Sequence, residues 1–211
     1  MQNSRAAFDP LSYENLGLSI VDALERQPIE QLKSVPKFKG AGIYALYYTG
    51  NFDLYAPVAE ANRKQPGSWA LYIGKADAEN SRKGLAVSPE EVGYKLYNRI
   101  KNHRRSIEQV ANLDIADFTV RLLVLTPTWV PLAEQIAIRT HSPLWNTHID
   151  GLGNHDPGSG RSGSQRSKWD TIHPGRPWAD KLHNNSIPPE DLAKSAYSSI
   201  EERLKKLNNN G

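Results

Sequence analysis

The sequence predicts a compact α/β domain at about residues 40–150, with a helical arm before it and a further segment after it. Three runs rich in apolar, aromatic and β-branched residues, at 41–48, 69–76 and 117–126, predict strands. Apolar residues at helical spacing lie between the second and third runs and again after the third. The order strand, strand, helix, strand, helix is that of a mixed α/β fold.

The first part of the chain adds one helix and two connecting segments. Residues 14–26 carry leucine, isoleucine and valine at helical spacing, which predicts a helix. A linker containing proline and lysine follows at 28–40. The insertion at 51–68, between the first two strands, is expected to be irregular and partly basic.

Two helices of the core have sequence signals at their ends. Ser88-Pro89-Glu90-Glu91 is a capping box with proline at the first helical position, which predicts a helix from 89 through His103. Pro131 opens the next helix, which is expected to run to about Thr140. Ser142-Pro143 ends it, because the residue before a proline disfavours the helical conformation.

The last part of the chain contains a loop and a long helix. Residues 151–168 are rich in glycine, serine and arginine and predict a loop. Residues 188–207 predict a helix with an apolar stripe of Leu192, Ala196, Ile200, Leu204 and Leu207. We therefore divide the chain into an arm at 1–39, a core at 40–150, and a segment at 151–211 that packs with the core as one domain.

Composition excludes some classes of protein. The chain of 211 residues has no cysteine, so it has neither disulfides nor thiolate metal sites. It contains no run of eighteen apolar residues that would span a membrane and begins with no secretory signal, so we expect a cytoplasmic protein. The net charge of +3 is only a weak indication of an acidic partner.

Two features break the packing pattern of the predicted helices. Lys95, Arg99 and His103 form a basic stripe directly beside the apolar stripe of their helix, which suits either a solvated edge or one wall of a phosphate site. Glu134 falls inside the apolar arc of the following helix. A buried carboxylate needs a cation, and either an arginine in an ion pair or a divalent metal meets that need.

The histidines give a weaker signal. His141, His148 and His155 are seven residues apart, but proline, tryptophan and glycine between them prevent any regular element from aligning them, so we expect no metal cluster there. Asn154-His155 faintly suggests a His-Asn-His nuclease finger.

A pair of tripeptides links these features to a known family. Gly42-Ile43-Tyr44 spells GIY and Tyr72-Ile73-Gly74 spells YIG, on the first two predicted strands. Arg99, Glu134 and Asn146 follow in order. Together they resemble the GIY-YIG nuclease superfamily, and two of these residues are those that break the packing pattern.

Longer segments make the resemblance more specific, because they match one branch of the superfamily. Between about 40 and 180 the chain is similar to the type II restriction endonucleases of this superfamily that cut CCGCGG, through GAGIYALYYTG, YIGKA, NRIKNH, NLDIADF, PLWNTHIDGLGNH, GSGR and HPGRPWA. One feature departs from the general pattern: Tyr72 follows Tyr44 by 28 positions, a longer separation than is usual in the superfamily.

The resemblance implies a fold, an activity and partners. The fold would be a small α/β (α+β) domain whose three-stranded, mainly antiparallel central sheet is flanked by helices. The activity would be hydrolysis of both strands of double-stranded DNA at a GC-rich palindrome, with Mg²⁺ as the metal and Mn²⁺ as a substitute. A palindromic target implies a homodimer, for which the N- and C-terminal helices are candidate interfaces. The resemblance also implies a cognate DNA methyltransferase in a bacterial cytoplasm.

The resemblance also implies the role of a tyrosine base. Tyr44 would take a proton from the attacking water if it were ionised. A free tyrosine has a pKa near 10, so acting near pH 7 requires about three units, or about 4 kcal/mol, of stabilisation. Lys75, Arg99 and a metal would supply that field, and His103 would relay or receive the proton.

The remaining roles concern the phosphate and the metal. Arg99 would hold the scissile phosphate, and Glu134 would anchor one Mg²⁺, which often needs only one or two carboxylates. Tyr72 would orient the water or the phosphate. Asn146 would position the metal, the Glu134 side chain or the backbone, and the sequence does not choose among these.

DNA contacts outside the active site are assigned from charge. The candidates are Arg63, Lys64, Arg104, Arg161, Arg166 and Lys168. Each suits either a contact with DNA or a solvated surface.

The sequence also bears on functions other than that of a restriction enzyme. The sequence argues against a nuclease of the PD-(D/E)xK class, because no Asp-x-Lys or Glu-x-Lys occurs in the chain. A repair or homing nuclease with the same core and a sequence-specific DNA-binding protein on a degenerate nuclease fold remain as alternatives.

Overall fold

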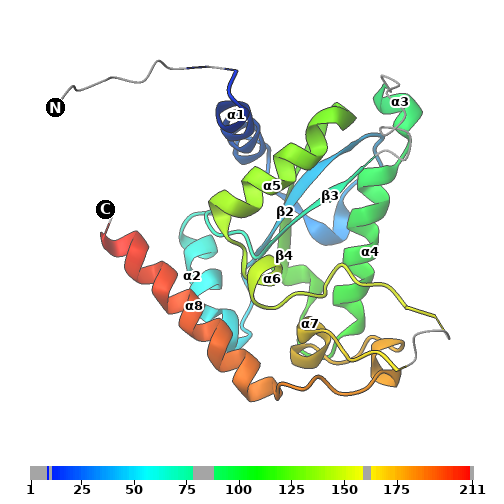
Figure 1. Cartoon of the computed structure of the whole chain (residues 1–211), viewed down its shortest axis with the longest axis vertical. Coiled ribbons are helices and arrows are strands. Elements are labelled where there is room, and N and C mark those ends of the chain that lie inside the picture. The colour runs from blue at the N-terminus through cyan, green and yellow to red at the C-terminus, as the bar shows by residue number, and fades with distance from the viewer. Residues whose placement is uncertain (1–8, 10, 78–87, 159–162, 210–211) are drawn as a thin grey trace.

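A four-stranded antiparallel sheet forms the centre of the molecule (Figure 1). The computed structural model describes residues 9, 11–77, 88–158 and 163–209. The spatial order of the strands is β1-β4-β2-β3. Their bounds are Glu30–Gln31 for β1, Ala41–Tyr48 for β2, Tyr72–Ala76 for β3 and Phe118–Leu125 for β4.

The expected mixed fold and its three strands are confirmed, and one strand is additional. β1 lies in the segment that the sequence predicts as a linker, where Glu30 and Gln31 pair with Val120 and Thr119 of β4. A strand of two residues is too short to show the alternation that identifies strands in a sequence. β3 is also shorter than expected, since it begins at Tyr72 rather than at residue 69.

β2 is buried on both faces of the sheet. Tyr44, Leu46 and Tyr48 belong to one core cluster, whereas Ile43, Ala45 and Tyr47 belong to another. Successive side chains of a strand point to opposite faces, so the continuous apolar run of β2 serves both cores.

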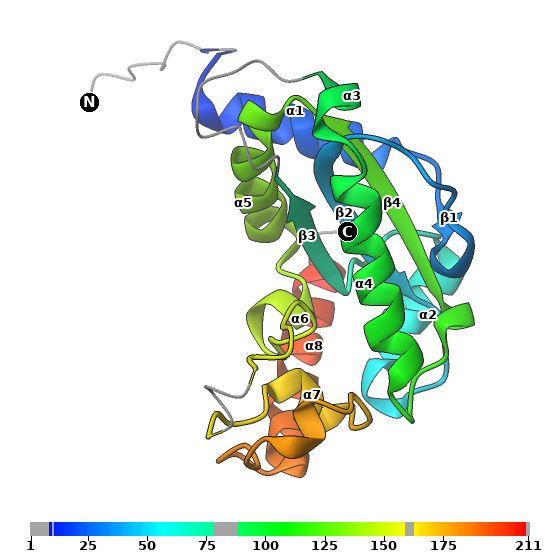
Figure 2. The same cartoon turned by 90° about the vertical axis from the view of Figure 1, so that its right-hand side faces the viewer.

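Helices cover both faces of the sheet (Figure 2). α1 (Tyr13–Glu25) and α5 (Val130–His141) lie on the face of Tyr47, while α4 (Lys95–Gln109) lies on the face of Tyr44. The remaining C-terminal helices are α6 (Leu144–Thr147), α7 (Lys168–Ile172) and α8 (Pro189–Asn209). Leu192, Ala196 and Ile200 of α8 are buried in the same cluster as Tyr44, with Leu204 partly buried against it. The side chain of Leu207 lies outside the described part of the chain.

The helix expected from 89 through His103 is two helices. The predicted capping box at Ser88 is present, but α3 (Pro89–Val92) ends at Gly93, which has a φ of +69°. α4 then begins at Lys95. The break follows from glycine, which adopts positive φ without a steric penalty and commonly ends helices.

The insertion between β2 and β3 is more ordered than the sequence predicts. It contains α2 (Ala56–Lys64). The buried Asn62 of α2 donates hydrogen bonds to the carbonyl oxygens of Tyr48 and Trp69, and its own carbonyl accepts from the amide of Trp69. One asparagine therefore ties the insertion to the last residue of β2 and to the segment that leads into β3.

Across the described ranges, no helix combines the length and the apolar character needed to cross a membrane.

Candidate active site

The two tyrosines of the GIY and YIG tripeptides meet on adjacent strands. Tyr44 of β2 lies opposite Gly74 of β3, and the rings of Tyr44 and Tyr72 have centroids 6.0 Å apart. A methyl group added to Gly74 would overlap the Tyr44 hydroxyl and would lie 2.8 Å from the Tyr72 ring. The glycine of YIG is therefore required because the Tyr44 ring crosses its Cα.

α4 brings His103 to Tyr44. The Tyr44 hydroxyl is hydrogen-bonded to Nε2 of His103, and both residues are buried. Burial holds the pKa of His103 well below its usual value, and the positive charge of Arg99 acts in the same direction. Burial and the neighbouring Tyr72 raise the pKa of Tyr44 well above 10. The phenol is therefore protonated and donates to a neutral imidazole.

This electrostatic setting differs from the one that an ionised Tyr44 needs. Arg99 lowers the pKa of Tyr44, as expected, but burial has the larger effect and raises it. The protein alone therefore does not produce a tyrosinate. The hydrogen bond between the two residues instead points the Tyr44 proton at Nε2 of His103.

Arg99 and Tyr72 form an outer layer over this pair. Both are partly exposed, whereas Tyr44 has no exposed surface. Burial lowers the pKa of Arg99, but interactions with Tyr44 and Tyr72 raise it by more. The guanidinium thus stays charged and lies next to both phenols, where it can meet an incoming anion.

A second group of charges lies around β3. The Lys75 ammonium is 3.2 Å from a carboxylate oxygen of Glu134 on α5 and 3.3 Å from one of Asp77. Burial raises the pKa of Glu134, and the opposite effect of Lys75 only partly offsets this. Burial lowers the pKa of Lys75, but Glu134 and Asp77 raise it by more. The partner of Glu134 is therefore a lysine, which neither of the alternatives drawn from sequence had named.

β3 is an edge strand, and the two groups of residues lie on its opposite faces. Tyr72 packs with the core of Tyr44, whereas the intervening Ile73 belongs to the core beneath α5. The groups still interact, since Arg99 lowers the pKa of Glu134 and Glu134 raises that of Tyr72. β3 is at the edge of the sheet, so no further strand lies beyond it. Side chains from its two faces can therefore approach one another around that edge.

The donor set around Lys75 fits a divalent metal. Two carboxylates, Glu134 and Asp77, already surround one cation. Mg²⁺ is commonly held by one or two carboxylates, with water and substrate oxygens completing its shell. Within the part of the chain that is described, no three or more His, Cys, Asp or Glu side chains form a group able to hold a metal. A metal here would therefore depend on substrate and water oxygens.

Asn146 of α6 contacts the backbone of β3. Its side-chain oxygen accepts from the amide of Ile73 at 2.8 Å, and its side-chain nitrogen donates to the carbonyl of Ile73 at 2.7 Å. Of the three alternatives left open by the sequence, the structure has the backbone contact. The asparagine closes the hydrogen-bonding edge of the sheet at the centre of the YIG tripeptide.

Sequence reasoning missed the contact between His155 and Arg99. Nε2 of His155 lies 3.2 Å from Nη1 of Arg99, and Gly153 packs against the same guanidinium. In the sequence, Asn154-His155 resembles only a faint nuclease motif and does not indicate a contact with Arg99. No local signal connects this segment to α4, because 56 positions separate His155 from Arg99.

The basic residues assigned to DNA also contact the protein itself. Arg63 donates to the carbonyls of Thr49 and Gly50, and Lys64 pairs with Glu60 at 2.7 Å. The others in the described part bind as follows: Arg104 to the Lys33 carbonyl and Glu108, Arg166 to the Ala179 carbonyl and Asp180, and Lys168 to Asp150. Arg161, the last residue of the GSGR motif, lies outside the described residues. The assignment of these side chains to DNA stays a prediction.

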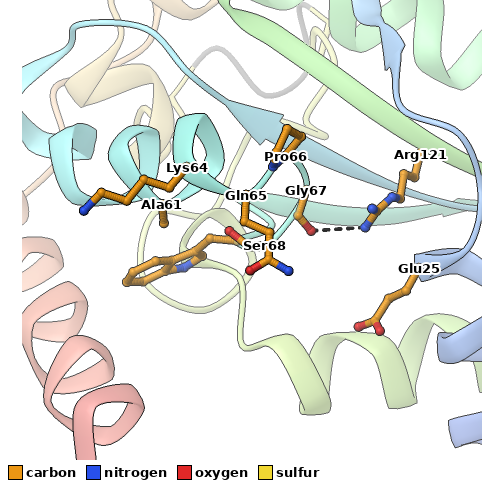
Figure 3. Close-up of a pocket in the computed structure, with 9 residues that line it drawn as sticks. Glu25, Ala61, Lys64, Gln65, Pro66, Gly67, Ser68 and Arg121 are labelled. Atoms are coloured by element: carbon orange, nitrogen blue, oxygen red, sulfur yellow. Dashed lines mark hydrogen bonds between the residues drawn. The ribbon is translucent and has the colours of Figure 1, made fainter. Parts of the chain in front are cut away.

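A cavity of about 660 Å³ lies away from this chemistry (Figure 3). It is lined in part by Glu25, Lys64 and Arg121. The Arg121 guanidinium sits over the Tyr47 ring and donates to the Gly67 carbonyl, so the cavity lies on the face of the sheet opposite Tyr44. A smaller cavity of about 240 Å³ includes His103 and His155 in its lining and adjoins the site described above.

The pairing of β2 with β3 places GIY and YIG side by side, with Arg99 and Glu134 reaching them from opposite faces. This is the fold and the residue pattern of a GIY-YIG endonuclease domain. Within that class, the chain belongs to the Eco29kI GIY-YIG domain family, whose model matches residues 36–205. No curated protein matches the chain.

Proposed function

We propose that this chain is a homodimeric type II restriction endonuclease that hydrolyses both strands of the palindrome CCGCGG. The observation that carries the proposal is the Tyr44 hydroxyl aimed at a neutral His103, directly beneath Arg99. Family membership supports a DNA substrate. The similarity of the longer motifs to enzymes that cut CCGCGG supports the particular palindrome.

The base in this proposal is a relay through Tyr44. As the attacking water gives a proton to the Tyr44 oxygen, Tyr44 passes its own proton to Nε2 of His103. Hydroxide forms and attacks phosphorus, while His103 becomes an imidazolium. This route avoids a free buried tyrosinate, which the raised pKa of Tyr44 disfavours. The scissile phosphate offsets the charge that develops on His103.

The outer residues bind and orient the substrate. Arg99 binds the scissile phosphate and stabilises the charge that develops on it. Tyr72, which is partly exposed, orients the water. Because Tyr44 has no exposed surface, substrate binding has to shift the partly exposed Tyr72, whose ring packs beside that of Tyr44, before the water reaches the Tyr44 oxygen. A divalent metal, Mg²⁺ or Mn²⁺, held by Glu134 would polarise the phosphate and stabilise the leaving oxygen.

Dimerisation follows from the two-fold symmetry of the proposed target. Exposed apolar side chains are available on the two helices considered for the interface, with Tyr13 and Leu18 on α1 and Tyr197 on α8. A cognate methyltransferase would protect the host DNA, with both enzymes in the cytoplasm. Sedimentation of the protein with and without a CCGCGG duplex measures the oligomeric state.

Plasmid cleavage tests the function. A plasmid with one CCGCGG site and a matched plasmid without it are incubated with Mg²⁺, with Mn²⁺ or with EDTA. Only the first plasmid should become linear, only with metal, and methylation of its site should protect it. Intact DNA under every condition, from folded protein, would reject the nuclease. Cleavage at another sequence would reject CCGCGG alone.

A further inference from the structure

The segment between α6 and α7 reaches the catalytic arginine. His155 places Nε2 at 3.2 Å from Nη1 of Arg99. A guanidinium carries only donors, so Nε2 of His155 must be the acceptor. The imidazole in this contact is therefore neutral, with its proton on Nδ1.

The same segment confines the other end of the guanidinium. A methyl group added to Gly153 would lie 2.8 Å from Nη2 of Arg99 and 3.4 Å from the Tyr72 hydroxyl. One terminal nitrogen of Arg99 is thus held by an imidazole, and the other is bounded by backbone. Because the guanidinium of Arg99 is planar and both of its terminal nitrogens are confined, it has little rotational freedom.

A buried ion pair holds this segment in place. Arg176 is fully buried and binds Asp170 through two hydrogen bonds of 2.6 and 2.7 Å. Its remaining donors bind the carbonyl oxygens of Gly151, Leu152 and Asn154 at 3.0 to 3.2 Å. The guanidinium carbon also lies 4.7 and 4.6 Å from the ring centroids of Trp169 and Trp178.

The Arg176 contacts explain how an irregular segment can position a catalytic group. A buried ion pair is costly to desolvate and is a poor source of net stability. Here Arg176 instead donates hydrogen bonds to the carbonyl oxygens of Gly151, Leu152 and Asn154, which come just before His155 in the chain. The backbone before His155 therefore has a defined path, although it has no regular secondary structure.

We propose that His155 is a positioning residue for Arg99, presented by the backbone segment that Arg176 and Asp170 hold. It accepts a hydrogen bond from Nη1 and so sets the plane in which the guanidinium meets the scissile phosphate. This role rests on the proposed nuclease function. His155 is exposed and lines the same cavity as His103, so it lies where the substrate would bind.

Single-turnover cleavage of a CCGCGG duplex tests the proposal with three variants. His155→Ala should slow cleavage by about 10- to 100-fold, the effect expected for losing one hydrogen bond to a charged group. Its DNA affinity in EDTA and its Tm should stay near those of the wild type. His155→Gln, which keeps an acceptor, should recover part of the rate. The control is His183→Ala, which changes an exposed histidine whose backbone pairs with that of Gln165.

A double-mutant cycle separates positioning from a general structural effect. In an Arg99→Lys background, which lacks the guanidinium fork, His155→Ala should slow cleavage further by less than about 2-fold. An equal loss in both backgrounds would show that His155 acts independently of Arg99. Wild-type cleavage by His155→Ala would overturn the proposal directly.

The imidazole ¹⁵N chemical shifts of His155 test the contact without any cleavage. The free protein should show a protonated Nδ1 and an Nε2 shift characteristic of an acceptor, and Arg99→Lys should move the Nε2 signal. An Nε2 signal unchanged by Arg99→Lys would refute the contact. This measurement stands even if the wild type cuts no DNA, so failure of the nuclease function and failure of the His155 role are distinguishable.

Discussion

The buried hydroxyl of Tyr44 donates a hydrogen bond to Nε2 of His103, which lies 59 positions later in the sequence. The pKa of the phenol is raised and that of the imidazole is lowered, so neither group is charged in the free protein. The pair is therefore neutral, with the proton on the phenol and directed at Nε2 of His103.

Removing the hydroxyl should abolish the relay. Tyr44→Phe keeps the ring in the core but leaves His103 without its donor, and cleavage should fall by about 10²- to 10⁴-fold. Single-turnover cleavage measures the loss, with DNA affinity measured in EDTA. Tyr47→Phe is the matched control, since its ring packs on the opposite face of the sheet. Comparable cleavage by Tyr44→Phe and Tyr47→Phe would remove Tyr44 from the mechanism.

Glu134 should be needed for cleavage but not for binding DNA. Glu134→Gln keeps a side chain that can still accept a hydrogen bond from Lys75, but it loses the charge that would hold a metal. We expect DNA affinity within about 3-fold of the wild type and cleavage reduced by at least about 100-fold. The control is Glu60→Gln, which alters an exposed glutamate that pairs with Lys64. Retained cleavage by Glu134→Gln would exclude Glu134 as the metal ligand.

Lys75 should compete with the metal in the free protein. Its ammonium lies within 3.3 Å of carboxylate oxygens of both Glu134 and Asp77, where a divalent cation would also be attracted. Lys75→Met removes that positive charge, so Mn²⁺ should bind the DNA-free protein about 3- to 30-fold more tightly. Electron paramagnetic resonance of Mn²⁺ measures the affinity, with Lys64→Met as the control. Weaker Mn²⁺ binding by Lys75→Met would show that the lysine supports the metal site instead.

Asn146 should protect the edge of the sheet. Asn146→Ala removes two hydrogen bonds to the Ile73 backbone, so we expect the free energy of unfolding to fall by about 1–3 kcal/mol. The Ile73 amide should then exchange with solvent faster, which hydrogen exchange measures residue by residue. Asn98→Ala, at an exposed position of α4, provides the comparison. Unchanged exchange at Ile73 would contradict the edge-closing role.

Acid should destabilise the fold through buried histidines. Burial lowers the pKa of His173 to about 3, and its ring nitrogens are hydrogen-bonded to Tyr55 and Asn112. The unfolded chain has a histidine pKa near 6.5, so below that pH the unfolded state binds more protons than the folded one. The free energy of unfolding should therefore fall with decreasing pH, by up to about 1.4 kcal/mol per pH unit for this residue.

Urea unfolding at several pH values between 7.5 and 5 measures this slope. His103 contributes in the same direction, because its pKa is also lowered. His173→Gln should reduce the slope, whereas His183→Gln, at an exposed position, should leave it unchanged. A slope in His173→Gln equal to that of the wild type would contradict a buried neutral His173.

Local patterns were sufficient to predict most of the elements. The apolar run of β2, the capping box at Ser88 and the stripe of α8 each follow from neighbouring residues, and each is present. The same patterns failed at β1, at Gly93 and at α2, which lies in the insertion that was expected to be irregular. The two-residue β1 has no periodicity, and Gly93 divides a helix whose apolar spacing continues past it.

The sequence by itself determined the family of the protein, marked Arg99 and Glu134 as residues that break the packing pattern, and marked Tyr44 and Tyr72 through the GIY and YIG tripeptides. Only the tertiary structure decided which groups these side chains contact: Lys75 for Glu134, His155 for Arg99, and the Ile73 backbone for Asn146. It also showed that Tyr44 and His103, which the resemblance had linked by role, are directly hydrogen-bonded. The physical reason is that periodicity reports which face of an element a side chain occupies. Partners that belong to different elements depend on how those elements pack, and no local pattern encodes that packing.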